Sequence, residues 1–111
     1  MFEINMNKLI SDIVVLARMI TKGTSYEIIA NYYGHVDSLE VRLYSPGVEE
    51  PTVRQDVSFD EEYRSKKVII KDLTELKNKL VEILVTGELD ISQMHKEKYG
   101  STETYFFLKR H

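Results

Sequence analysis

The hydrophobic period of this chain changes near Ser25, and that change constrains the fold more than any other feature. Over residues 7–22, apolar side chains recur every three or four positions, which predicts one helix. Beyond Ser25, apolar and polar residues alternate, which is typical of half-buried strands. This alternation predicts three antiparallel strands, over residues 26–33, 39–44 and 53–59.

The second half of the chain combines helical and extended patterns. Residues 66–70 favour a short fourth strand, and a capping-box spacing at Asp72 then predicts the start of a second helix that stops at Gly87. Residues 90–100 predict a short helix opened by an aspartate cap. Residues 105–108 predict a last strand or an apolar tail docked on the body.

These elements predict an α+β fold with an N-terminal helix, a three- to four-stranded antiparallel sheet, C-terminal helices packed on one sheet face, and a terminal strand. A chain of 111 residues is short for two domains, so we expect a single α+β domain over residues 1–111. Strands do not alternate with helices along the chain. A parallel nucleotide-binding sheet is therefore not expected.

The composition excludes several classes of protein. There is no cysteine, which rules out disulfide scaffolds, thiolate metal sites and cysteine nucleophiles. The net charge of −3 is too small to indicate a nucleic-acid binder or an acidic mimic of DNA. No apolar run reaches the roughly 20 residues of a membrane helix, and the N-terminus lacks the features of a secretory signal. We therefore expect a cytoplasmic protein with no membrane partner.

The residues do not form a pattern typical of a catalytic site. His35, His95 and His111 lack the spacing of metal ligands. The densest group of acids, Asp56 with residues 60–62, lacks the glycine turn and the glutamate of a calcium loop. Serine-nucleophile motifs and glycine-rich phosphate loops are absent as well. We expect a protein that is not an enzyme and that uses neither a metal nor a cofactor.

Charge is distributed unevenly along the chain. Residues 37–62 hold eight acids and two arginines, a balance of −6, whereas residues 63–81 hold six basic residues and two acids, a balance of +4. Such a dipole can orient a charged partner and raise its association rate. The alternative is a lopsided surface that serves solubility alone.

Seven tyrosines and no tryptophan give a second indication of binding, although tyrosine is also an ordinary half-buried sheet residue. One strand face is predicted to expose aromatic residues among charges. The residues that we expect to bind a partner are Tyr33, Glu40, Arg42 and Tyr44 on that face, with Glu49, Glu50, Asp60, Glu61 and Glu62 in flanking loops.

The segment 32–44, which reads YYGHVDSLEVRLY, resembles a segment of small uncharacterised phage and prophage proteins of Gram-positive bacteria. The resemblance implies no catalytic residue. It implies a non-enzymatic phage-type protein that binds a host protein in the host cytoplasm and inhibits or modulates it. A nucleic-acid-processing enzyme is one such partner, for example a defence nuclease such as a CRISPR effector.

Two alternatives remain open from the residues alone. One is accessory nucleic-acid binding through a strip of lysines, namely Lys66, Lys67, Lys71, Lys77 and Lys79. The other is a self-associating structural protein, a homo-oligomer, because Val15, Leu16 and Met19 widen the apolar stripe of the first helix beyond one packing surface.

Overall fold

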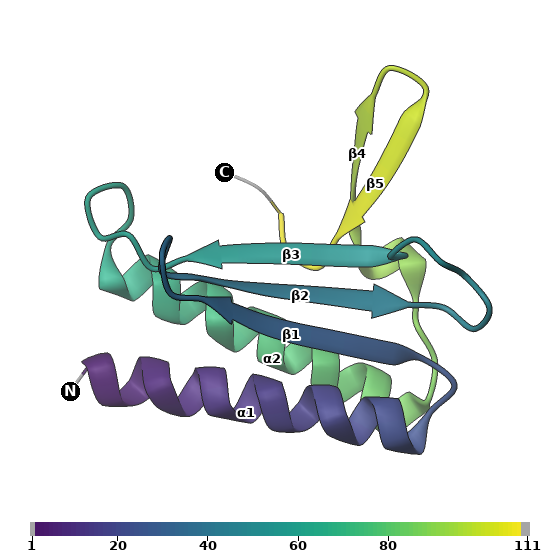
Figure 1. Ribbon diagram of the computed structural model, residues 1–111, viewed down its shortest axis with the longest axis horizontal. Coiled ribbons are helices and arrows are strands. Elements are labelled where there is room, and N and C mark those ends of the chain that lie inside the picture. Colours follow the sequence, from purple (N-terminus) through teal and green to yellow (C-terminus); the bar gives the residue numbers. More distant parts are fainter. Residues whose placement is uncertain (1, 110–111) are drawn as a thin grey trace.

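The computed structural model describes residues 2–109, with the side chains of residues 5–109, so the prediction for His111 lies outside the described residues. Two long helices and five strands make up the fold, which is of the α+β class (Figure 1). In chain order the elements are α1 (Phe2–Gly23), β1 (Glu27–Tyr33), β2 (Ser38–Tyr44), β3 (Val53–Ser58), α2 (Lys66–Thr86), the 3-10 helix η1 (Ile91–Gln93), β4 (His95–Tyr99) and β5 (Thr102–Phe106).

The five strands form one mixed sheet in the order β1-β2-β3-β5-β4. The three predicted strands β1, β2 and β3 pair antiparallel, as expected. The sheet as a whole is not antiparallel, because β5 pairs parallel to β3, with Val53 opposite Tyr105 and Arg54 opposite Phe106. The β4–β5 hairpin extends away from the body of the molecule, at the end of the sheet farthest from β1 (Figure 1).

Both helices pack on one face of the sheet, where alternate strand residues meet their apolar stripes. Leu39, Val41 and Leu43 of β2 are fully buried there. The helices α1 and α2 lie side by side (Figure 1), and Lys77 of α2 reaches Asp12 of α1 at 3.0 Å. The residues of the helices that join the same core are Met6, Ile13, Leu16, Ala17, Ile20, Ile69, Leu73, Leu76, Leu80 and Ile83.

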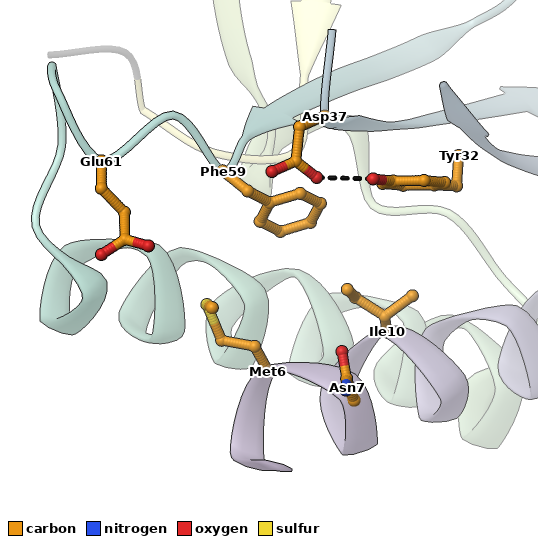
Figure 2. A pocket seen from close by; sticks show the side chains of 7 residues that line it. All are labelled: Met6, Asn7, Ile10, Tyr32, Asp37, Phe59 and Glu61. Atoms are coloured by element: carbon orange, nitrogen blue, oxygen red, sulfur yellow. Dashed lines mark hydrogen bonds between the residues drawn. The ribbon is translucent and has the colours of Figure 1, made fainter. Parts of the chain in front are cut away.

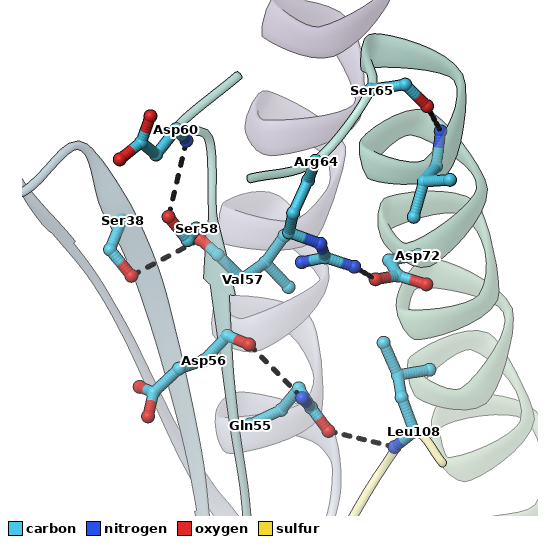
Figure 3. Close-up of polar contacts among 11 residues, drawn as sticks. Ser38, Gln55, Asp56, Val57, Ser58, Asp60, Arg64, Ser65, Asp72 and Leu108 are labelled. Atoms are coloured by element: carbon cyan, nitrogen blue, oxygen red, sulfur yellow. Dashed lines mark hydrogen bonds and ion pairs between the residues drawn. The ribbon is translucent and has the colours of Figure 1, made fainter. Parts of the chain in front are cut away.

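The start of α2 differs from the prediction. Residues 66–70 are the first turns of the helix rather than a fourth strand, because the N-cap is Ser65, whose hydroxyl accepts a hydrogen bond from the Val68 amide at 3.2 Å (Figure 3). Asp72 is therefore not a cap. It is buried within the helix and forms an ion pair with Arg64 (Figure 3). The predicted end is confirmed, since Gly87 takes a φ of 72° and donates its amide to the Ile83 carbonyl.

The short helix predicted over residues 90–100 is wrong beyond its first turn. Asp90 does cap a helix, but this is only the single 3-10 turn of η1. Residues 95–99 form β4 instead, so His95 lies on a strand. The reason is the pair Gly100-Ser101, a two-residue turn with Gly100 at a φ of 61° that joins β4 to β5 as a hairpin.

The C-terminal segment confirms part of the prediction for residues 105–108. The strand β5 ends at Phe106, and Phe107 and Leu108 then pack into the core as an apolar tail. The amide of Leu108 donates a hydrogen bond of 2.9 Å to Oε1 of Gln55, a buried polar side chain on the helix-facing side of β3 (Figure 3). Gln55 thus ties the chain end to the sheet.

Candidate functional site

The face of β1, β2 and β3 that points away from the helices, which we call the open face, gathers the predicted strand residues. Tyr33, Glu40, Arg42 and Tyr44 all lie on it. The last three alternate with the buried residues of β2, and Tyr33 of β1 pairs with Ser38, which lies on the same side of β2. These side chains are half-buried or exposed, unlike the fully buried residues between them. Their role in binding stays a prediction.

Glu40 is the centre of a polar cluster on the open face. Its carboxylate accepts a hydrogen bond from the Tyr33 hydroxyl at 3.3 Å. It also lies 3.1 Å from Arg42 Nε, as an ion pair without hydrogen-bond geometry, and 3.6 Å from Arg54 Nη2 of the next strand. The Glu40 side chain is only 16% exposed, whereas that of Arg54 is 42% exposed. One carboxylate therefore lies within interaction distance of two arginines and a tyrosine at the surface.

The two acidic loops do not lie together. The β2–β3 loop carries Glu49 and Glu50 at one end of the sheet, and the β3–α2 loop carries residues 60–62 at the other end (Figure 1). Asp60 also has a local role, since its carboxylate accepts a hydrogen bond of 3.0 Å from the Glu62 amide. The predicted binding residues thus form three separate groups, one on the open face and one at each end of the sheet.

The predicted lysine strip also divides, because the five lysines point in different directions around α2. Lys66 lies 3.8 Å from Glu61, and Lys77 pairs with Asp12 of α1. Lys79 donates to the Gln93 carbonyl at 2.8 Å. Only Lys67 and Lys71, one turn apart and exposed, offer their charges to solvent together.

A pocket that the sequence did not indicate lies between the start of α1 and the β1–β2 turn (Figure 2). It has a volume of about 480 Å³. Met6, Ile10, Tyr32 and Phe59 supply its apolar walls, and Asn7, Asp37 and Glu61 supply its polar groups. In Figure 2, Tyr32, Asp37 and Phe59 face Met6 and Ile10 of α1.

Tyr32 and Asp37 are linked across this pocket. The Tyr32 hydroxyl donates to Asp37 Oδ1 at 2.6 Å, and the Tyr32 ring lies 6.3 Å from that of Phe59. The hydrogen bond to Asp37, with smaller contributions from burial and from the Asp37 charge, raises the pKa of the Tyr32 hydroxyl. Asp37 itself has a φ of 47°, a left-handed conformation that Asp and Asn tolerate better than most residues. The turn thus fixes the carboxylate at the pocket rim.

The part of the chain that the structure describes holds neither a metal-binding cluster nor a membrane-spanning helix. Among the described side chains of residues 5–109, no group of three or more histidine or acidic side chains is arranged to hold a metal ion. None of the described helices is long and apolar enough to cross a membrane.

Comparison of the chain with protein-family models, with curated proteins and with solved structures found no match in any of the three.

Proposed function

We propose that the protein is a non-enzymatic binding protein that docks on another protein through its open face. The observation that carries this proposal is the cluster around Glu40. Tyrosine and arginine are among the residue types most enriched at the energetic centres of protein interfaces. Here Tyr33, Arg42 and Arg54 meet at one carboxylate on a surface that neither helix covers.

The cluster favours binding because Glu40 already lies next to Tyr33 and both arginines without a partner present. An arginine that is held by a carboxylate loses less conformational freedom when a partner contacts it than a free arginine does. The half-exposed Arg54 keeps part of its guanidinium accessible for a carboxylate or carbonyl of the partner. Tyr44, at the end of the same face, adds an apolar surface with a hydroxyl.

The partner we propose is a host protein, on the basis of the resemblance of residues 32–44 to phage proteins. Inhibition or modulation of that host protein, such as a defence nuclease, would take place in the host cytoplasm. The acidic loops at the two ends of the sheet would orient the partner through its basic surface. The charges of Glu49 and Glu50 can be reversed in one variant and those of Glu61 and Glu62 in another. Only the variant whose altered loop faces the partner should associate more slowly than wild type.

The experiment is capture of a partner from a Gram-positive host lysate with the tagged protein, with and without nuclease treatment. Wild type is compared with Arg42→Ala and Tyr44→Ala, and with Lys71→Ala on the exposed side of α2 as the control. We expect one protein, retained equally after nuclease digestion, whose capture falls about tenfold in both open-face variants and is unchanged in the control.

Two outcomes would contradict the proposal. Capture of nucleic acid alone, lost in moderate salt, would instead support the lysine alternative, with Lys67 and Lys71 as its exposed residues. Equal capture by all variants would show that the open face is not the binding surface.

A further inference from the structure

The pocket beneath the β1–β2 turn combines apolar walls with an unneutralised negative charge. Among the described residues, no lysine, arginine or histidine forms an ion pair with Asp37, and one of its oxygens accepts from Tyr32. Glu61, at the far side of the pocket, lies 3.8 Å from Lys66, so its charge is partly neutralised. The pocket is therefore complementary to a group with an apolar stem and a positive end.

The outer edge of β1 borders this pocket and offers unpaired backbone groups. The hydroxyl of Thr21 bonds both the amide and the carbonyl of Ile28, at 2.9 and 3.3 Å, which shows that the backbone groups of Ile28 point away from β2. Alternation along the strand directs the same groups of Ala30 and Tyr32 outward. Within the described chain these groups form no hydrogen bond with another element.

Tyr32 belongs to both features, because its side chain lines the pocket and its backbone lies on the open edge. An added strand that pairs with Ala30 and Tyr32 would therefore direct one side chain toward the pocket. We propose that this edge and pocket bind an extended peptide segment of a partner protein, with a lysine or arginine side chain in the pocket. The mode is strand addition, in which the main chain supplies affinity and the pocket supplies specificity.

The side chain that fits is one that buries a hydrocarbon stem and keeps its charge at the rim. Met6, Ile10 and Phe59 provide the surface for the methylene groups of lysine or arginine. Asp37, held by Tyr32, provides the fixed carboxylate for the cationic end. This site lies beneath the turn and off the open face, so its test does not depend on the function proposed above.

The experiment is a titration of the isotope-labelled protein, followed by NMR, with two blocked pentapeptides that differ at the central position. One carries lysine, Thr-Val-Lys-Val-Thr, and the other carries the uncharged analogue norleucine in its place. We expect the lysine peptide to shift the amides of residues 30–37 and 59–61 and to bind about three- to fivefold more tightly than the norleucine peptide. Hydrogen exchange at the Ala30 and Tyr32 amides should slow when the peptide is bound.

The matched variants are Asp37→Asn and Glu75→Gln, each of which removes one negative charge. Asparagine tolerates the left-handed backbone at position 37 and can still accept from Tyr32, so the turn is expected to fold. Asp37→Asn should abolish the preference for the lysine peptide, and Glu75→Gln, on the exposed side of α2, should leave it unchanged.

Three results would overturn the proposal. One is the absence of these amide shifts up to about 5 mM peptide, which corresponds to negligible affinity. Another is a lysine preference that survives Asp37→Asn or falls equally in Glu75→Gln. The third is binding without slower exchange at Ala30 and Tyr32, which would exclude strand addition.

Discussion

The two faces of β2 are stabilised by different interactions, although their residues alternate along one strand. On the face toward the helices, Leu39, Val41 and Leu43 have no exposed surface. On the open face, Glu40 and Arg42 keep part of their side chains exposed and interact through charge. Apolar burial contributes roughly 25 cal/mol per Å², whereas a partly exposed ion pair contributes only about 0–1 kcal/mol. The comparison teaches that the open face can be altered without loss of the fold, which a binding surface requires.

Leu43 and Tyr44 are neighbours on opposite faces of β2, and their substitution should show the largest difference in stability between the two faces. Leu43→Ala leaves a cavity in the core and should lower the free energy of unfolding by about 3 kcal/mol. Tyr44→Ala removes a half-buried side chain from the open face and should lower it by about 1 kcal/mol or less. Urea denaturation of both variants measures the difference. An equal loss of unfolding free energy in both variants would mean that Tyr44 is as tightly packed as a core residue.

The ion pair between Arg64 and Asp72 is more deeply buried than the Glu40 cluster on the open face. Asp72 is only 6% exposed. Asp72→Asn should therefore lower the free energy of unfolding by about 2 kcal/mol, because the Arg64 charge would lose its main counter-charge in a partly buried place. Denaturant unfolding measures this, with Glu75→Gln on the same helix as the control. A change below about 0.5 kcal/mol would show that solvent screens the pair.

Gln55 is a buried polar residue at a helix-facing position of the sheet. Gln55→Leu should lower the free energy of unfolding by about 1–2 kcal/mol, because the buried Leu108 amide would lose its acceptor. Hydrogen exchange at Leu108 should become faster than in wild type. A variant as stable as wild type, with unchanged exchange at Leu108, would show that the packing of Phe107 and Leu108 suffices to hold this segment.

The smallest expected effect is the pH dependence that Asp12 contributes. Hydrogen bonds from Lys8, and then from Lys77, lower the pKa of its carboxyl. A carboxyl whose pKa is lower in the folded state stabilises the fold above its ordinary pKa of about 4, and this contribution is lost as the pH falls further. Lys77→Met should therefore make the fall in melting temperature between about pH 5 and pH 2 shallower. An unchanged slope would show that the hydrogen bond from Lys77 does not contribute to this pH dependence.

The sequence predicted those parts of the fold in which periodicity and local signals agree. The strands β1, β2 and β3 were found because their alternate residues face one core, and the end of α2 was found because Gly87 takes a left-handed conformation. The start of α2 was missed, because Asp72 and Glu75 have the spacing of a capping box and Ser65 has no such partner. Only the tertiary contact with Arg64 shows that Asp72 is buried.

The elements missed or placed only in part were those that depend on long-range contacts. The β4–β5 hairpin is polar on both faces for most of its length, so it lacks the apolar alternation of a half-buried strand. The pocket brings together Met6, Tyr32 and Phe59 from three separate segments of the chain, which no local pattern predicts. The four open-face residues were grouped correctly, because alternation alone sets their face.

The most direct test of the central claim is photo-cross-linking from each side of the molecule. A benzophenone amino acid replaces Tyr44 on the open face in one variant. In another variant it replaces Val85 of α2, a residue that is 77% exposed. Both proteins are irradiated in host lysate, and the cross-linked products are identified by mass spectrometry. We predict that the open-face position links to one protein and that the helix position does not. Cross-links to that protein from Val85, with none from Tyr44, would contradict the assignment of binding to the open face.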